Sequence, residues 1–332
     1  MEGAVLSAVV IGRNEAARLE ACLRSVWGMV DPGLALEVIY VDSGSTDESV
    51  QVAASLGAHV IQLNSARPTA AMGRNAGWRA SRGSLVLFLD GDTVLHPEFV
   101  WRALPAFSDG TVAAVCGRRV ESRPLDSIYN RIFDLDWNGP AGETDYCGGD
   151  ALFRREALEA ADGYDSTLIA GEEPEMCTRL RLGGWRIIRM DVAMTQHDLA
   201  ITEASQWWRR GVRTGYAYAQ IAARFAGTRI PLWRENVVRN RNRVLAFTLL
   251  LFAGPVGLVL GGTYWFFAMS AGVFALLFLR TAFKARHKTN SFVTALLYGV
   301  HSHLQQVPIY VGQRRYARDA RGKIAGALIE YK

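Results

Sequence analysis

The chain has 332 residues, of which half are hydrophobic and 21% are charged; this composition excludes a disordered chain, a collagen-like chain and a small disulfide scaffold. Residues 1–200 hold 18 Lys and Arg against 28 Asp and Glu, a net charge of −10, whereas residues 201–332 hold 19 against 4, a net charge of +15. We expect metals or cationic groups on the acidic part and anionic lipid headgroups on the basic part, but no nucleic acid, because no RNA- or DNA-binding motif accompanies the basic residues.

The first 90 residues alternate between strand and helix patterns. Strands are predicted over 5–11, 37–41, 59–63 and 85–89, and helices over 15–27, 48–56 and 71–81. Strands separated by helical segments indicate βαβ units of a parallel sheet. Ligands bind beyond the carboxyl ends of such strands, so Asp42 and Asp90, each at a strand end, are candidate site residues.

Two carboxylates bracket one glycine directly after the strand over 85–89, in Asp90-Gly91-Asp92. Mg²⁺ and Mn²⁺ prefer such oxygen ligands and keep open positions for phosphate oxygens. Ordinary turn chemistry is the alternative interpretation. His197, which follows a strand-like segment over 187–194, is a further candidate metal ligand.

Three other polar segments are candidates for the same site. The turn that begins at Asp42 can accept hydrogen bonds from a base or ribose, or cap the next helix. Arg74 can bind phosphate with its planar guanidinium, or lie in solvent on its helix. Glu172, Glu173 and Glu175 are crowded into four positions. Such crowding favours proton uptake by one carboxylate, as a general base requires, but acidic residues also suit a first helical turn.

The four cysteines, at positions 22, 116, 147 and 177, lie far apart and form no CxxC pair. We therefore expect isolated, reduced thiols in a cytosolic compartment. The apolar run near Met1 lacks a preceding basic segment, which favours a first buried strand over a signal peptide.

Residues 244–279 form 36 consecutive positions without a charge. One membrane span needs about 20 residues, so this run predicts two spans, with the turn at Gly261-Gly262. Basic residues flank both ends, at positions 234, 239, 241 and 243 and at positions 280, 284, 286 and 288. The positive-inside rule then places both ends in the cytosol. A buried helical hairpin of a soluble protein is the alternative.

Two segments beside this hairpin have the composition of interfacial helices. Segment 204–226 interleaves Trp and Tyr with Arg, and segment 291–311 repeats apolar residues at three- and four-residue steps. Frequent polar residues in the second segment argue against a third span.

Five motifs in order resemble the family 2 inverting glycosyltransferases of the GT-A fold, over about residues 5–218. The motifs are Val-Val-Ile-Gly-Arg-Asn14-Glu15-Ala, Val-Asp42-Ser-Gly-Ser-Thr-Asp, Gly-Arg74-Asn-Ala-Gly, Asp90-Gly-Asp92 and Gly-Glu172-Glu173. A glycine-rich turn, Gly148-Gly149-Asp150, resembles the family's turn before a helix. The predicted fold class is therefore α/β, with a Rossmann-like GT-A domain.

The resemblance implies a nucleoside diphosphate sugar as donor, with a UDP-sugar expected, and Mg²⁺ or Mn²⁺ as cofactor. The implied donor-binding residues are Glu15, Asp42, Arg74, Asp90, Arg209 and Arg210. The implied metal ligands are Asp92, Asp90 and His197. Glu173 is the implied general base, with Glu172 beside it in the catalytic turn.

Three departures from the family pattern bear on function. Ile11 replaces the usual proline before the first turn, and Glu173 replaces the usual aspartate of the catalytic pair. The Gln-x-x-Arg-Trp motif of processive members appears as Gln206-Trp-Trp-Arg209-Arg210. The last change favours transfer of a single sugar over processive synthesis.

We therefore expect a catalytic domain over 1–200, interfacial helices over 201–243, a transmembrane hairpin over 244–280 (spans 244–261 and 263–280), and an amphipathic helix with a basic tail over 281–332. The expected enzyme lies in the inner or plasma membrane with its catalytic domain and both termini in the cytoplasm. It adds one sugar to a lipid-linked or membrane-presented glycan.

Two rival interpretations remain open. A sugar nucleotidyltransferase shares the fold, but its glycine-rich, lysine-containing loop is absent from residues 12–15. A catalytically inactive GT-A scaffold at the membrane is the other, and the intact Asp90, Asp92 and Glu173 argue against it.

Overall fold

The computed structural model describes residues 5–137, 139–261 and 264–322. They form two compact units: an N-terminal unit of Met1–Arg123 and Trp137–Leu199, and a C-terminal unit of Pro124–Asp136 and Ala200–Lys332. The expected turn residue Gly262 and the last ten residues of the expected basic tail lie outside the described residues.

The N-terminal unit is built on a nine-stranded sheet with the order β3-β2-β1-β4-β8-β6-β9-β5, and β7 pairs with β9. The strands are β1 (Val5–Gly12), β2 (Ala35–Asp42), β3 (His59–Gln62), β4 (Leu85–Asp90), β5 (Thr93–Leu95), β6 (Val112–Glu121), β7 (Gly142–Glu143), β8 (Ala151–Arg154) and β9 (Arg186–His197). Strands β3, β2, β1 and β4 are parallel, and β8 is antiparallel to both its neighbours. The central strands are apolar along their length because helices cover both faces of the sheet.

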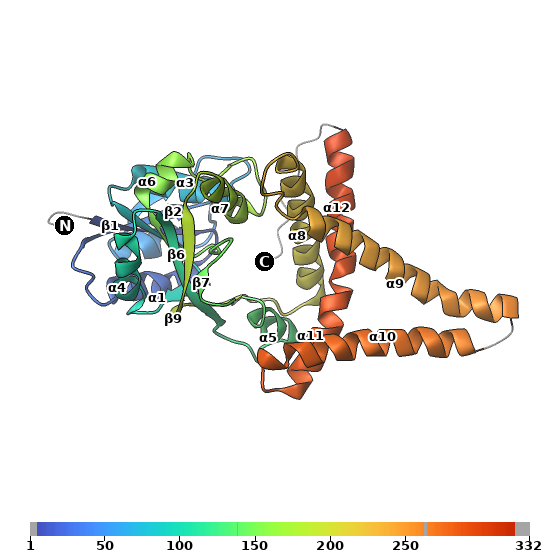
Figure 1. Cartoon of the computed structure of the whole chain (residues 1–332). Helices are drawn as coiled ribbons and strands as arrows, with labels where there is room; N and C mark the ends of the chain where they lie inside the picture. The colour runs from blue at the N-terminus through green and yellow to red at the C-terminus, as the bar shows by residue number, and fades with distance from the viewer. Residues whose placement is uncertain (1–4, 138, 262–263, 323–332) are drawn as a thin grey trace. The chain divides into compact units, whose positions relative to one another are not determined.

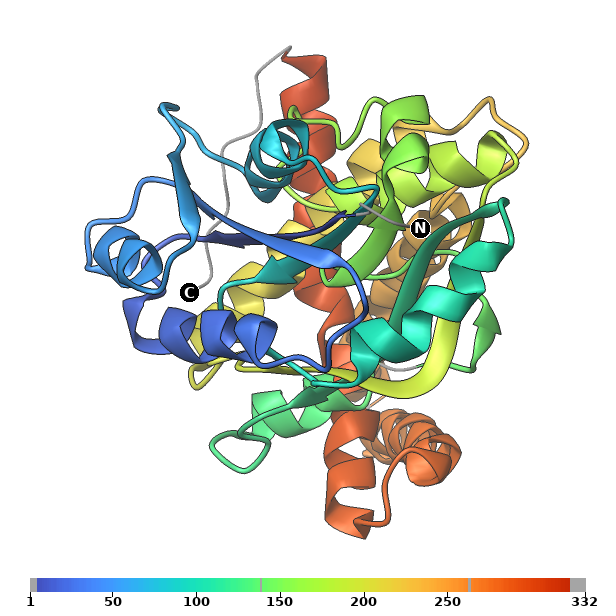
Figure 2. The same ribbon diagram turned by 90° about the vertical axis from the view of Figure 1, so that its left-hand side faces the viewer.

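Helices α3, α6 and α7 lie on one face of this sheet, and α1 and α4 lie on the other (Figures 1 and 2). The helices of the unit are α1 (Ala16–Trp27), α2 (Ser49–Ser55), α3 (Ala70–Ala80), α4 (Phe99–Ala103), the 3₁₀ helix η1 (Leu104–Ser108), α6 (Arg155–Ala160) and α7 (Glu172–Leu182). In α1, Leu19, Cys22, Leu23 and Val26 are buried. Their three- and four-residue spacing gives the amphipathic face predicted for this segment. The strand and helix order predicted over the first 90 residues is confirmed.

Strand register brings two predicted site residues to one edge of the sheet. Asp42 pairs with Gly12, and Asp90 pairs with Ile11, so the two carboxylates end the strands on either side of β1. Backbone hydrogen bonds continue past the ladder, from Ser43 N–H to the Gly12 carbonyl (2.9 Å) and from Gly91 N–H to the Ile11 carbonyl (2.8 Å). Both turns are therefore held against the end of β1.

The C-terminal unit is helical within its described residues. Its helices are α5 (Ile128–Asp134), α8 (Ala204–Arg224), α9 (Arg234–Gly261), α10 (Trp265–Lys284), the 3₁₀ helix η2 (Ala285–His287), α11 (Phe292–Leu304) and α12 (Gln306–Arg321). Helices α8 and α12 lie side by side (Figure 1). Gly215 faces the Ile309 carbonyl and Gly312 faces the Val212 carbonyl, each too closely for a side chain. These two glycines allow the backbones of α8 and α12 to meet.

Helices α9 and α10 carry the apolar run predicted to form two spans. By length and composition, both are able to cross a membrane, over Arg234–Gly261 and Trp265–His287. Only 18% and 11% of their most apolar stretches are buried within the protein. A hairpin buried in a soluble core would instead have most of these side chains covered.

The prediction of one amphipathic helix over 291–311 is wrong, because the chain breaks this segment into α11 and α12 at Gln305. Proline lacks a backbone N–H, and its ring clashes with the carbonyl four residues earlier in a continuous helix. For Pro308 that residue is Leu304, where α11 ends. The new helix begins at Gln306, so Pro308 lies in its first turn, where no such clash arises.

His301 predicts a pH dependence for the stability of the C-terminal unit. The indole N–H of Trp207 donates to Nδ1 of His301 (3.0 Å), and burial lowers the pKa of this histidine to about 4, with Arg210 adding to the shift and Asp136 opposing it. Below pH 6.5 the His301 imidazole binds a proton in the unfolded chain but stays neutral in the folded chain down to about pH 4. Above pH 6.5, titration of His301 is expected to leave the free energy of unfolding unchanged. Between pH 6.5 and pH 4, it is expected to lower the free energy of unfolding by roughly 3 kcal/mol.

Thermal unfolding of the purified chain in detergent, followed from pH 8 to pH 4, measures this loss. His301→Gln keeps a hydrogen-bond acceptor for the Trp207 indole but does not titrate, so its melting temperature is expected to fall less over the acidic range. An identical fall in both proteins would show that other groups cause the acid sensitivity.

Candidate active site

Asp90, Asp92 and His197 form one cluster at the carboxyl edge of the sheet. Their ligand atoms all lie within 4.8 Å of one another, and Nε2 of His197 is 3.5 Å from Oδ1 of Asp92. The strand β5 explains how the distant histidine arrives there, because Thr93 pairs with His197 in the β5–β9 ladder. Two carboxylates and one imidazole are a suitable ligand set for a divalent metal.

Asp150 anchors the turn that carries these carboxylates, a role not predicted from the sequence. It is fully buried, and its Oδ1 accepts the backbone N–H of Asp90 (3.0 Å). Its Oδ2 accepts the Thr195 hydroxyl (2.9 Å) and pairs with Arg119 (2.8 Å). Burial raises the pKa of Asp150, and the Arg119 cation opposes that shift. The glycine-rich turn Gly148-Gly149-Asp150 was the only sequence signal for this role.

Arg74 joins the Asp90 turn to the first turn of α7. The guanidinium is buried (2% exposed) and donates to Oδ1 of Asp90 (2.7 Å) and to Oε1 of Glu172 (2.8 Å). Burial works against its charge, but the two carboxylates outweigh burial and raise the pKa of Arg74. Gly149 lies directly against this pair, since a Cβ there would approach the Arg74 guanidinium and the Asp90 carboxylate at under 3.0 Å. Both ends of the guanidinium therefore hold acidic side chains in position.

Replacing Arg74 with methionine is expected to destabilise the N-terminal unit by about 3–5 kcal/mol, because it leaves two carboxylates without their buried cation. Arg79→Met is the matched control on the same helix, because Arg79 pairs with Asp162 at the surface, with side chains 50% and 93% exposed. Loss of the Arg79–Asp162 pair is expected to lower the free energy of unfolding by at most about 1 kcal/mol. Denaturant unfolding measures both, and an equally small loss for Arg74→Met would contradict a buried bridging role.

The first two loops of the site are joined by side-chain hydrogen bonds. Oδ1 of Asn14 accepts the backbone N–H of Thr46 (2.8 Å), and Oδ2 of Asp47 accepts the N–H of Ala16 (3.0 Å). Asn14 has a left-handed backbone (φ 56°), which asparagine tolerates better than most residues. The motifs around Glu15 and Asp42 therefore form one continuous rim at the end of β1 and β2.

Asp42 and Glu15 both lie on this rim, largely buried. The Asp42 carboxylate holds its own turn, accepting the backbone N–H groups of Gly44 (3.0 Å) and Ser45 (2.9 Å) and the hydroxyl of Tyr40 (3.2 Å). Glu15 forms an ion pair with Arg18 (2.5 Å). Glu15 lies against Gly91 of the Asp90 turn, whereas Asp42 ends the strand on the other side of β1. Contact of either carboxylate with a nucleotide stays a prediction.

The three carboxylates of the α7 turn have different partners. Glu172 binds Arg74, as described above. Oε1 of Glu173 accepts the backbone N–H of Cys147 (2.7 Å). Glu175 forms a forked ion pair with Arg179 (2.8 Å), which also donates to the Gly163 carbonyl (2.7 Å). Glu172 is therefore joined to the Asp90 turn through Arg74, Glu173 is held by the Cys147 turn, and Glu175 is paired within its own helix.

The expectation of four isolated thiols is wrong for one pair. All four cysteines are free and buried, but the sulfurs of Cys147 and Cys177 are 3.7 Å apart. Both thiols also contact Oε1 of Glu173, at 3.2 and 3.0 Å. Burial raises the pKa of each thiol, which keeps both protonated as hydrogen-bond donors. Residues 30 positions apart meet here because the Cys147 turn packs on the first turns of α7.

Arg209 and Arg210 belong to α8 in the C-terminal unit. The Arg210 guanidinium lies over the Phe133 ring (4.9 Å to its centroid), and Nε of Arg209 donates to the Ser205 carbonyl (3.4 Å). The structure brings the other predicted site residues together in the N-terminal unit. Donor binding by these two arginines stays a prediction.

Two family profiles match the chain. Residues 7–161 match the family described as glycosyl transferase family 2, and residues 85–284 match glycosyl transferase family group 2. The second match covers more than half of the chain. The chain belongs to the family 2 glycosyltransferases. The predicted family is therefore confirmed.

Relatives of known activity include the pre-mycofactocin glycosyltransferase of Mycobacterium tuberculosis, 29% identical over 243 residues, which are 68% of this chain and 49% of that protein. Glucosyl-3-phosphoglycerate synthase of Mycolicibacterium paratuberculosis is 32% identical over 192 residues, 55% of this chain and 52% of that protein. The family 2 chain described here thus spans about half the length of the curated relatives it matches.

Solved structures share the GT-A fold with this family 2 member. The mannosyltransferase PcManGT of Pyrobaculum calidifontis, in complex with GDP-Man and Mn²⁺, matches with a TM-score of 0.63 and 21% identity, over 89% of this chain and 86% of that one. Residues 1–349 of S. aureus TarS, in complex with UDP-GlcNAc, match with a TM-score of 0.52 and 16% identity, over 96% and 92%. The predicted fold class is confirmed.

Proposed function

We propose that this protein transfers a single sugar, with inversion, from a nucleoside diphosphate sugar to a hydroxyl of a lipid-linked or membrane-presented glycan. The observation that carries the proposal is the placement of Asp90, Asp92 and His197 beside the acidic first turn of α7, joined through Arg74. A metal-binding turn next to a proton acceptor is what such a displacement requires.

Asp90, Asp92 and His197 would hold a divalent metal. An imidazole beside two carboxylates suits Mn²⁺ better than Mg²⁺, which prefers oxygen ligands. When bound, the metal neutralises charge on the diphosphate leaving group. The structural relative PcManGT is in complex with GDP-Man and Mn²⁺, which supports this assignment.

The rim formed by Glu15 and Asp42 would bind the nucleoside, and Asp90 the ribose or donor sugar. Arg74 would act as a positioning residue, since its guanidinium holds Asp90 and Glu172. A UDP-sugar is the proposed donor, with GDP-sugars as the alternative. Arg209 and Arg210 would contact the donor from α8.

Glu173 would be the general base. Three donors act on its Oε1, which fixes the carboxylate and leaves Oε2 to take the acceptor proton. As the proton moves to Glu173, the acceptor oxygen bonds to the anomeric carbon, and the bond to the nucleoside diphosphate breaks on the opposite side. The product therefore has inverted anomeric configuration.

We further propose that residues 1–200 form the catalytic domain, that 244–280 is a transmembrane hairpin flanked by interfacial helices over 201–243, and that the catalytic domain and both termini are cytoplasmic. The exposed apolar surfaces of α9 and α10 and the basic residues at both ends of the run support this orientation. An acceptor anchored in the cytosolic leaflet would then lie at the surface that the enzyme occupies.

Cysteine labelling tests the orientation. We expect single cysteines introduced at Gly261 and Lys284, in a chain whose native cysteines are replaced, to be labelled from opposite sides of the membrane. These positions end α9 and α10, so two spans place them about one bilayer apart. Labelling of both from the same side would replace the two-span proposal with a hairpin lying on the surface.

The proposed activity is tested by incubating the purified chain with a panel of UDP- and GDP-sugars, Mn²⁺ and membrane lipid extract, and measuring the released nucleoside diphosphate. We expect nucleoside diphosphate to be released from one of the donors, and this release to require the metal. Release of pyrophosphate from a sugar phosphate and a nucleoside triphosphate would favour the nucleotidyltransferase. Donor binding without release from any sugar would favour the inactive scaffold.

A further inference from the structure

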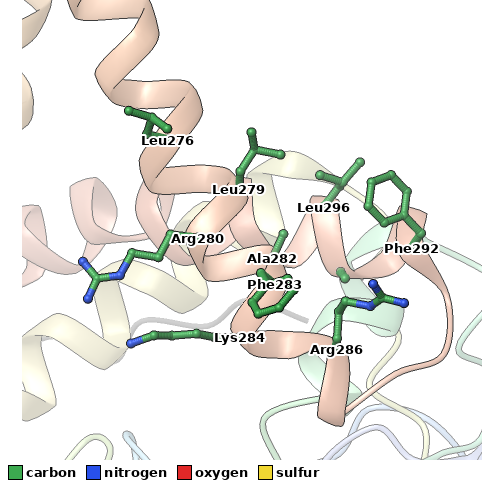
Figure 3. A pocket seen from close by; sticks show the side chains of 10 residues that line it. Leu276, Leu279, Arg280, Ala282, Phe283, Lys284, Arg286, Phe292 and Leu296 are labelled. Carbon is green, nitrogen blue, oxygen red and sulfur yellow. The ribbon is translucent and has the colours of Figure 1, made fainter.

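A pocket with a volume of about 460 Å³ lies between the end of α10 and the start of α11, within the C-terminal unit (Figure 3). Apolar side chains from both helices line it, among them Leu276, Leu279 and Leu296. Figure 3 shows Leu276 and Leu279 extending from α10 and Leu296 from α11. The pocket is large enough for part of a lipid molecule.

The same pocket carries three cations, Arg280, Lys284 and Arg286, and none of its lining residues is acidic. Arg280 and Lys284 extend to one side of α10, and Arg286 lies near Phe292 (Figure 3). Within the described ranges, none of the three is ion-paired with a carboxylate, whereas the neighbouring Lys288 pairs with Asp136 (3.1 Å). The pocket therefore has positive charge that the described part of the protein leaves without a counter-charge.

The apolar lining continues onto uncovered surface. Leu276 is 69% exposed, Phe283 is 75% exposed and Phe292 is 62% exposed. Ala282 and Ala295, which form the floor, are buried. A ligand that complements both features needs an anionic group for the cations and a hydrocarbon chain for the exposed apolar side chains. A soluble anion would leave the apolar side chains bare.

We propose that this pocket binds one anionic phospholipid, with the phosphate at Arg280 and Lys284 and an acyl chain along Leu276 and Leu279. Arg286, on the other side of the pocket, adds to its positive potential. The site shares no residue with the proposed sugar-transfer site, so the proposal does not rest on that function. The cations favour an anionic headgroup, and the exposed apolar side chains of α10 favour a ligand that also has a hydrocarbon chain. The bound lipid would orient the end of α10 at the headgroup layer.

Native mass spectrometry of the full chain in a non-ionic detergent tests the site, without any sugar donor. Phosphatidylglycerol is compared with phosphatidylcholine of the same acyl chains. We expect one phosphatidylglycerol to be retained, roughly 10- to 100-fold more tightly than phosphatidylcholine, since three cations contribute. The triple variant Arg280→Gln, Lys284→Gln, Arg286→Gln is expected to abolish that preference.

The matched control removes the same charge from the other flank, as Arg234→Gln, Arg239→Gln, Arg241→Gln on α9. It is expected to keep the preference, and circular dichroism checks that both variants are folded. An equal loss in both would show that net charge alone attracts the lipid and would overturn the proposal. Displacement of phosphatidylglycerol by inorganic phosphate would also overturn the proposal. Much tighter binding of a polyprenyl phosphate, which displaced phosphatidylglycerol, would overturn it as well and would make the pocket an acceptor site.

Discussion

Replacing Asp92 with alanine is expected to abolish sugar transfer while the N-terminal unit stays folded. Asp92 lies in the turn after β4, next to His197, and a strand-end turn contributes little to the core. Loss of one proposed metal ligand removes charge stabilisation of about 4 kcal/mol, or ~10³-fold in rate at ~1.4 kcal/mol per decade. Transfer to the acceptor and Mn²⁺ binding in the presence of nucleoside diphosphate are both measured, and both should fall.

Asp191→Ala is the control for this experiment. Asp191 lies on β9, the strand that carries His197, but its side chain is 74% exposed and pairs with Arg118 at the surface (3.0 Å). Its loss should leave both metal binding and transfer close to the unchanged protein. If Asp92→Ala keeps more than a small fraction of the activity, the assignment of the metal site is wrong.

Glu173→Gln is expected to lower kcat by about 10²–10⁴-fold, or roughly 3–5 kcal/mol, and to leave donor binding largely unchanged. Glutamine keeps the shape of the side chain and still accepts the Cys147 N–H, but it has no basicity. The loss therefore isolates proton transfer from positioning. Steady-state kinetics with saturating acceptor, together with calorimetric donor binding, separates the two effects.

Glu175→Gln and Glu172→Gln are the matched comparisons in the same helical turn. Glu175 is ion-paired with Arg179, so its replacement should lower stability more than kcat. Glu172 contacts Arg74, so Glu172→Gln should lower kcat far less than Glu173→Gln does. If Glu175→Gln abolished turnover while Glu173→Gln was normal, the proposed base would be misplaced by two residues. Equal losses at all three positions would indicate that the summed charge acts, with no single base.

Local pattern was sufficient to predict the order of the strands and helices over the first 90 residues, and the strand-end positions of Asp42 and Asp90. Each of these features depends on residues only a few positions apart, because apolar periodicity and turn residues are local properties. The strand-end rule then places both carboxylates at one edge of the sheet, as the register with Ile11 and Gly12 confirms. The single helix over 291–311 failed for an equally local reason, the proline at position 308.

The partners of the site residues were decided by tertiary structure alone. Arg74 and Glu172 are 98 positions apart, Asp90 and Asp150 are 60 apart, and Cys147 and Cys177 are 30 apart. No periodicity links such positions, since their contacts depend on how helices pack on the sheet and on where the turns between strands return. From the sequence, Arg74 was equally consistent with a solvent-exposed residue, and Asp150 had no predicted role beyond its place in a glycine-rich turn. Burial decided both, because a charge removed from water must be paired, and only the folded chain brings its partner within reach.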